Sequence, residues 1–109
     1  MTIERGTTQL ITITIKGWDL TGCDIYVTFK QGNNVLTKTT MDSVVYANNQ
    51  TKLKVTLTQG DTLRFADNAD GQLQVRWVGS DGDARKTKVA PFRTDEALYE
   101  KTIEWEGEP

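Results

Sequence analysis

The chain has 109 residues, with 13 basic and 15 acidic side chains, one cysteine and no histidine, and this is the length of one domain with its own core. The single Cys23 excludes an internal disulfide, and the lack of histidine excludes a cysteine–histidine zinc site and serine–histidine or cysteine–histidine nucleophile pairs. The net charge of −2 and the absence of a long apolar run argue against a nucleic-acid partner and a membrane partner, because phosphate binding needs clustered cations and a membrane helix needs roughly 18 apolar residues.

Alternation of apolar and polar residues predicts the strands of the N-terminal half. Residues 8–15 and 24–31 alternate most regularly and are rich in β-branched and aromatic side chains, which suit a pleated surface. Between them, a glycine-flanked turn is expected to place Trp18 and Leu20 under the end of the fold. The inward-facing residues of the two strands are predicted to be Ile11, Ile13, Ile15, Ile25, Val27 and Phe29.

The middle of the chain continues the pattern with shorter elements. Residues 32–34 are a hairpin signal, and the more polar strand predicted over 35–40 is expected near a sheet edge. A short strand over 44–46 and a turn at 48–50 follow. Leu53, Val55 and Leu57 then form the next inward stripe.

The segment that follows residue 57 predicts how the strands are arranged. Thr58 and Asp61 have the spacing of a capping box, which predicts one helical turn over 58–65 with Leu63 and Phe65 closing the core. Such a turn is typical of the crossover between the two sheets of immunoglobulin-like sandwiches. We therefore predict one domain, residues 1–109, that is all-β: an immunoglobulin-like antiparallel β-sandwich with one short helical turn between the sheets.

The last hairpin turns near Asp81 and Gly82, and its register decides which side chains are buried. A two-residue turn would put Lys86 opposite Trp77 and Lys88 opposite Val75, inside the core, where an unpaired charge is costly. A three-residue turn over 81–83 with a bulge instead pairs Trp77 with Thr87 and Val75 with Val89.

The register with the three-residue turn leaves a basic outer face on the hairpin, formed by Arg76, Lys86 and Lys88. Residues 94–109, predicted as a C-terminal arm or last strand, are acidic and carry Tyr99 and Trp105. These charges have two interpretations: a solvated surface, or docking of the acidic tail on the basic hairpin within one chain or between subunits. The candidate interface residues are Arg76, Lys86, Lys88, Tyr99, Glu100 and Trp105.

No catalytic, cofactor-binding or metal-binding residue is predicted, and we expect a protein that is not an enzyme. The loop over 67–71 resembles a calcium loop, but Ala69 and Val78 occupy positions that need oxygen ligands. The aspartates lie in predicted turns, where local hydrogen bonds favour them, rather than in the paired arrangement of a glycosidase. The aromatic residues could form a sugar platform; Trp77 is expected in the core, whereas Tyr26 and Trp105 are expected to be exposed.

A family resemblance is carried by three stretches: GWDLTGCDIYVTFKQG, KLKVTLTQGDTLRFADNADGQLQVRWVGSDG and ALYEKTIEWEG. They resemble small structural proteins of tailed phages and prophages of Gram-positive bacteria, and they are similar to the N-terminal immunoglobulin-like domain of phage baseplate upper proteins. The resemblance implies a β-sandwich in the virion tail or baseplate, with no catalytic residue to carry over.

The resemblance also implies how such a protein would act. It would assemble with other virion proteins and with copies of itself, after synthesis in the bacterial cytoplasm. The first residues contain no apolar secretion signal, which agrees with that expectation. The alternative from another functional class is a carbohydrate-binding module for host-surface glycans.

Overall fold

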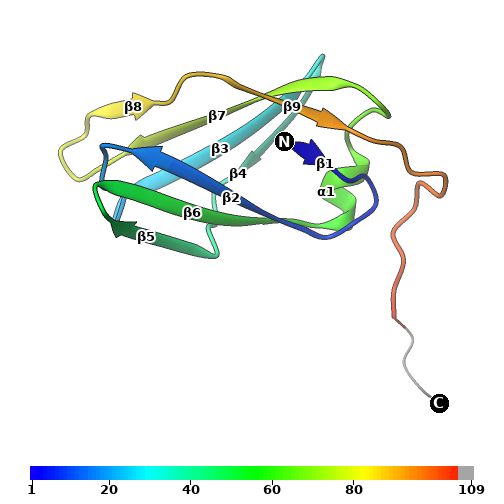
Figure 1. Cartoon of the computed structure of the whole chain (residues 1–109), viewed down its shortest axis with the longest axis horizontal. Coiled ribbons are helices and arrows are strands. Elements are labelled where there is room, and N and C mark those ends of the chain that lie inside the picture. Colours follow the sequence, from blue (N-terminus) through cyan, green and yellow to red (C-terminus); the bar gives the residue numbers. More distant parts are fainter. Residues whose placement is uncertain (106–109) are drawn as a thin grey trace.

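A computed structural model describes residues 1–105 of the chain, which form two β-sheets packed as a sandwich (Figure 1). The larger sheet has the order β1–β9–β7–β3–β4 with β8 paired to β7, and the smaller sheet has the order β2–β6–β5. The predicted all-β sandwich is confirmed, and its immunoglobulin-like detail stays a prediction. The elements are β1 (Thr2–Ile3), β2 (Gln9–Lys16), β3 (Asp24–Gln31), β4 (Asn34–Lys38), β5 (Ser43–Ala47), β6 (Gln50–Leu57), α1 (Gln59–Leu63), β7 (Asp70–Val78), β8 (Ala84–Lys86) and β9 (Ala90–Thr94).

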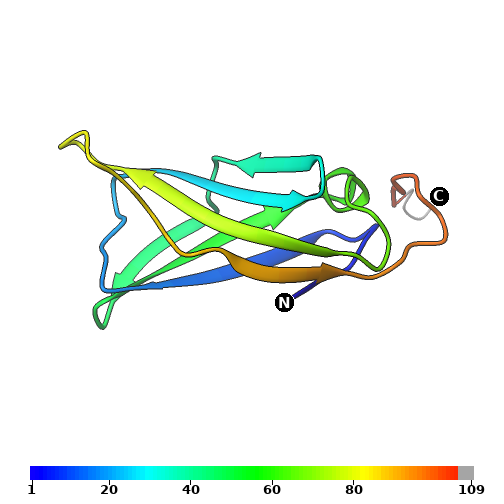
Figure 2. The ribbon, with the colours of Figure 1, turned by 90° about the horizontal axis from the view of Figure 1, so that it is seen from above.

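The predicted alternation is confirmed in the long strands. In β2, Ile11 and Ile15 are buried whereas Leu10 on the other face is exposed. β3 coincides with residues 24–31, and β4 forms the edge of the larger sheet, as expected. The core lies between the two sheets, which Figure 2 shows from above. It contains Ile3, Ile11, Ile15, Leu20, Ile25, Val27, Phe29, Leu36, Leu53, Val55, Leu57, Phe65, Leu73, Val75, Trp77 and Phe92.

The capping box that the sequence predicts is formed at the start of α1. The Thr58 hydroxyl accepts from the Asp61 amide, and the Asp61 carboxylate accepts from the Thr58 amide. α1 carries the chain from β6 in the smaller sheet to β7 in the larger sheet, so the predicted crossover is confirmed. Phe65 closes the core, but Leu63 is only half-buried, and Thr62 is buried in its place.

An aromatic cluster fills the core at the α1 end. Phe29 from β3, Phe65 after α1 and Phe92 from β9 meet edge to face, with ring centroids 5.4–6.2 Å apart. Phe92 lies directly opposite Gly71 in the β7–β9 ladder, and its ring occupies the space that a side chain at position 71 would need. A glycine at this position therefore decides how closely β9 packs.

The hairpin prediction is right that the loop has an odd number of residues and wrong about how many residues it has. β7 and β8 pair Trp77 with Arg85 and Val78 with Ala84, so the loop contains residues 79–83. A two-residue turn is excluded and the loop is odd, as expected, but Val89 is exposed and does not face Val75. Thr87 takes that place, because its amide donates to the Val75 carbonyl oxygen.

The extra residue that was expected at the turn lies farther along the chain. β7 pairs with both β8 and β9. Its register with β8, where Trp77 faces Arg85, differs by one residue from its register with β9, where Leu73 faces Ala90. The bulge over residues 87–89 thereby exchanges the faces of the strand. Lys86 points away from the core on one side of the bulge, and Phe92 points into it on the other.

Two parts of the fold were not predicted. β1 pairs in parallel with β9, and its Ile3 is fully buried. Leu20 is buried as expected, but Trp18 is 44% exposed, which contradicts its expected place under the sandwich. Trp18 packs against Trp77 with centroids 5.9 Å apart, and the Arg85 guanidinium lies 4.7 Å above the Trp18 ring.

The C-terminal segment is an arm. β9 ends at Thr94, and residues 95–105 form neither a helix nor a strand as they leave the domain beside α1 (Figure 1). The rest of the predicted arm, residues 106–109, lies outside the described residues. Within residues 1–105, no helix has the length and apolar character to cross a membrane.

Candidate interaction surfaces

Three exposed side chains form a row across the outer face of the larger sheet. Tyr26 on β3 is paired with Arg76 on β7, which is paired in turn with Lys86 on β8. We call these three residues the basic face. Lys88 is exposed but lies in the bulge, outside the strand pairing. Among the described residues, neither Arg76 nor Lys86 makes a salt bridge, so both charges are available to a partner.

Two shallow hollows adjoin the basic face. One, of about 260 Å³, is lined by Tyr26, Arg76, Trp77, Val78 and Ala84. The other, of about 410 Å³, is lined by Gln74, Arg76, Ala84, Arg85 and Lys86. Arg76 borders both, so a ligand in either hollow would meet a cation.

The arm, residues 95–105, carries large apolar side chains that do not pack on the domain. Leu98 is 94% exposed, Tyr99 63%, Ile103 63% and Trp105 88%. Its contacts with the domain are few and polar: the Gln59 side chain donates to the carbonyl oxygen of Ile103 and accepts from its amide, each at 2.8 Å. At Ile103 the arm is therefore attached through its backbone, and its four large apolar side chains remain exposed.

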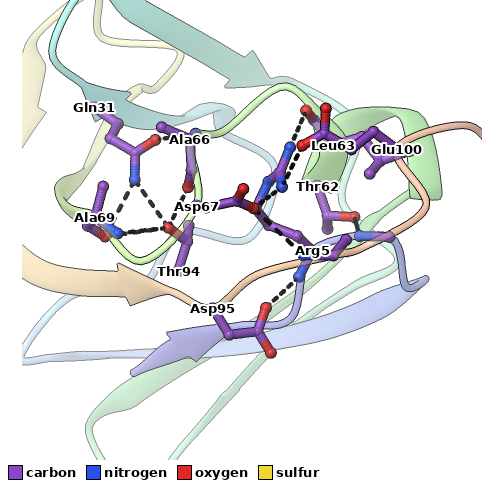
Figure 3. A network of polar contacts seen from close by, with 12 residues as sticks. Arg5, Gln31, Thr62, Leu63, Ala66, Asp67, Ala69, Thr94, Asp95 and Glu100 are labelled. Atoms are coloured by element: carbon purple, nitrogen blue, oxygen red, sulfur yellow. Dashed lines mark hydrogen bonds and ion pairs between the residues drawn. The ribbon is translucent and has the colours of Figure 1, made fainter.

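A buried arginine holds the base of the arm (Figure 3). The Arg5 side chain is 5% exposed and forms ion pairs with Asp67 and, at 3.2 Å, with Glu100 of the arm. Its guanidinium also donates to the Leu63 carbonyl oxygen at 3.2 Å, and its backbone amide donates to Asp95 at 2.8 Å. One residue thus joins the N-terminal segment, the end of α1, the loop before β7 and the arm.

A second polar network lies beside Arg5 and fixes the start of the arm (Figure 3). The Thr94 hydroxyl accepts from the Ala69 amide and from the Gln31 side chain. The Gln31 side chain also accepts from the Ala66 amide. Sequence reasoning missed both networks, because their members lie far apart along the chain and show no local spacing.

The six residues predicted for the interface are all exposed, but they form two separate groups. Arg76, Lys86 and Lys88 lie toward the β7–β8 hairpin, and the three arm residues lie beside α1 at the other end of the molecule (Figure 1). Within residues 1–105, the acidic tail therefore does not dock on the basic hairpin of its own chain. Glu100 pairs with Arg5 instead.

A third candidate surface surrounds Trp18. A hollow of about 170 Å³ there is lined by aromatic, acidic and arginine side chains, among them Trp18, Asp19 and Arg85. Hydrogen bonds from the hydroxyl and then the amide of Thr21 lower the pKa of the Asp19 carboxyl. No group of three histidine, cysteine, aspartate or glutamate residues within the described chain is placed to hold a metal ion.

No protein-family model matches this chain, and no curated protein matches it either. The likeness to phage structural proteins therefore rests on the three sequence stretches alone.

Proposed function

We propose that this protein is a non-enzymatic structural module of a phage or prophage virion, in the tail or baseplate, and that it acts through protein–protein assembly. The observation that carries the proposal is the arm. Leu98, Tyr99, Ile103 and Trp105 are exposed together on one short segment, and clustered exposed apolar side chains with aromatic anchors are typical of protein-binding surfaces. Burying each of them would contribute about 1.5–3 kcal/mol.

The sheets provide further support for assembly. β4 ends the larger sheet and β5 ends the smaller one, so each has a row of backbone groups to which a partner can add a strand. β5 also exposes Val45 and Tyr46. The order β2–β6–β5 against β9–β7–β3 is compatible with the order B–E–D and G–F–C of an immunoglobulin-type sandwich, the fold that the resemblance implies.

The test is whether the protein is part of a particle. Particles are purified by density gradient from the bacterial strain that carries the gene, and each fraction is analysed by quantitative mass spectrometry. We expect this chain to co-sediment with tails in a constant ratio to the other tail proteins. Finding it only in the soluble fraction would refute the proposal.

A matched pair of variants tests the role of the arm in that assembly. In a strain that lacks the gene, the variant Leu98→Ser with Tyr99→Ser should remain soluble and stay out of the particles. The variant Leu10→Ser removes an apolar side chain of β2 that is 55% exposed, and it should be incorporated normally.

A carbohydrate-binding module for host-surface glycans is the second candidate, favoured by exposed Tyr26 beside the Arg76 hollow. A sugar could stack on the ring while Arg76 donates hydrogen bonds to its hydroxyls. A glycan array followed by calorimetric titration tests this function. Saturable binding that Tyr26→Ala abolishes would support it, and a flat array would reject it.

A further inference from the structure

The arm and the basic face have opposite charges. The described arm contains Glu96, Glu100 and Glu104 with a single cation, Lys101, whereas Arg76 and Lys86 on the basic face have no acidic partner within residues 1–105. Complementary surface charges of this kind guide association and set its orientation. Each surface therefore has the charge that the other would bind.

The described arm is held away from the basic face of its own chain. It leaves the domain beside α1, and the β7–β8 hairpin lies at the other end of the molecule (Figure 1). Hydrogen bonds between the Gln59 side chain and the backbone of Ile103 hold the arm at the α1 end.

The hollow on the basic face suits one large side chain. Its volume is about 260 Å³, just below the roughly 300–1,000 Å³ of pockets that bury a drug-sized ligand. Tyr26, Val78 and Ala84 line it on the outer face of the sheet, with Arg76 at its border. An aromatic anchor flanked by carboxylates has the matching chemistry, and Trp105 preceded by Glu104 is such an anchor.

We propose that the arm of one copy docks on the basic face of a second copy, with Trp105 in the hollow and Glu104 beside Arg76 and Lys86. This inference rests on the proposed function and names a partner for it, a second copy of this chain. The contact joins two different surfaces, so a pair of copies keeps one free basic face on the first copy and one free arm on the second. Repeated head to tail, such a contact closes into a ring or continues as a filament.

The test uses two full-length variants, each with one blocked surface. The face variant carries Arg76→Glu and Lys86→Glu, and the arm variant carries Glu104→Lys and Trp105→Ser. All four positions are exposed, so both variants should fold, which circular dichroism checks. By analytical ultracentrifugation, we expect the wild type to self-associate and each variant alone to be monomeric.

The mixture of the two variants is the decisive sample. The free arm of the face variant should bind the free basic face of the arm variant, giving a 1:1 dimer that grows no further. Raising the salt concentration to 1 M should weaken this dimer on the order of tenfold, because exposed ion pairs are then screened. A monomeric mixture beside a self-associating wild type would overturn the proposed contact.

A control variant separates this contact from a general effect of charge. Lys16→Glu with Lys52→Glu makes the same charge change on β2 and β6, on the outer face of the other sheet, and it should self-associate like the wild type. A monomeric wild type would also overturn the inference. It would leave the proposed virion function intact, since incorporation into particles is measured separately.

Discussion

The substitution Gly71→Ala tests whether the close approach of β7 and β9 is as tight as the structure shows. A Cβ atom at position 71 would lie 2.6 and 2.8 Å from the Cε1 and Cε2 atoms of Phe92, with the Cζ atom nearer still. Real Cβ atoms essentially never approach heavy atoms so closely, so the ring or the strand must move. Phe92 has little room to move, because Phe29 and Phe65 pack against its ring.

The magnitude follows from the cost of overpacking. Inserting a methyl group into a packed core costs typically about 1–3 kcal/mol, and this site belongs at the upper end because the obstacle is a buried ring. Alanine recovers about 0.4–1 kcal/mol by restricting the unfolded chain. We expect a net loss of about 2 kcal/mol in the free energy of unfolding, which for a domain of this size is a fall of about 10 °C in Tm.

Urea denaturation followed by tryptophan fluorescence measures this loss. Gly60→Ala is the matched control: its new Cβ meets only the Thr58 hydroxyl oxygen at 3.8 Å, and alanine is the better helix former, so stability should rise by about 0.5 kcal/mol. Phe92→Leu should relieve the clash, making the double variant with Gly71→Ala more stable than additivity predicts by at least about 1 kcal/mol. A Gly71→Ala protein as stable as the wild type would refute the argument.

Two further predictions concern the polar contacts around α1. Asp67→Ala leaves the buried Arg5 guanidinium without its nearer carboxylate and should lower the free energy of unfolding in urea by about 2 kcal/mol. The control Asp70→Ala removes an exposed ion pair and should lower it by less than about 0.5 kcal/mol. Equal losses would contradict the role given to Arg5. Burial alone would raise the pKa of the Asp61 carboxyl, but hydrogen bonds from Lys38 and Thr58 and the positive charge of Lys38 lower the pKa overall. The stability that Asp61 contributes is therefore fully present above the unfolded pKa, about 3.9, and is lost as the pH falls through the lower folded pKa. When unfolding is measured as a function of pH, Asp61→Asn should be destabilising at pH 7 and progressively less so below pH 4. A loss of stability that does not depend on pH would contradict the assignment.

The strands and their inward faces could be predicted from the sequence because that information is local. The alternation in β2, β3 and β6 repeats every two residues, and side chains two residues apart lie on one face. The capping box at Thr58 and Asp61 likewise needs only four consecutive residues. The odd number of residues in the last hairpin loop followed from the cost of burying lysine. Side chains alternate between the two faces of a strand, so only an odd loop keeps the lysines outside the core.

The candidate surfaces could be predicted only in part for the same reason. Alternation places Arg76 and Lys86 on the outer face, and both are exposed there. The alternation does not indicate where the arm leaves the domain. Docking of the tail on its own hairpin was therefore a reasonable alternative, and within residues 1–105 the structure rejects it. The exposure of Trp18 was also missed, because a turn residue has no alternation to place it.

The sequence by itself determined the long strands, which of their faces are buried and where the chain crosses between the sheets. Only the tertiary structure decided the position of the bulge over 87–89, the pairing of β1 with β9, the burial of Arg5 and the end of the molecule at which the arm lies. Arg5 and its two carboxylate partners are separated by 62 and 95 residues along the chain. Such contacts form only when the assembled sheets bring distant segments together, and no short-range pattern in a single sequence encodes that proximity.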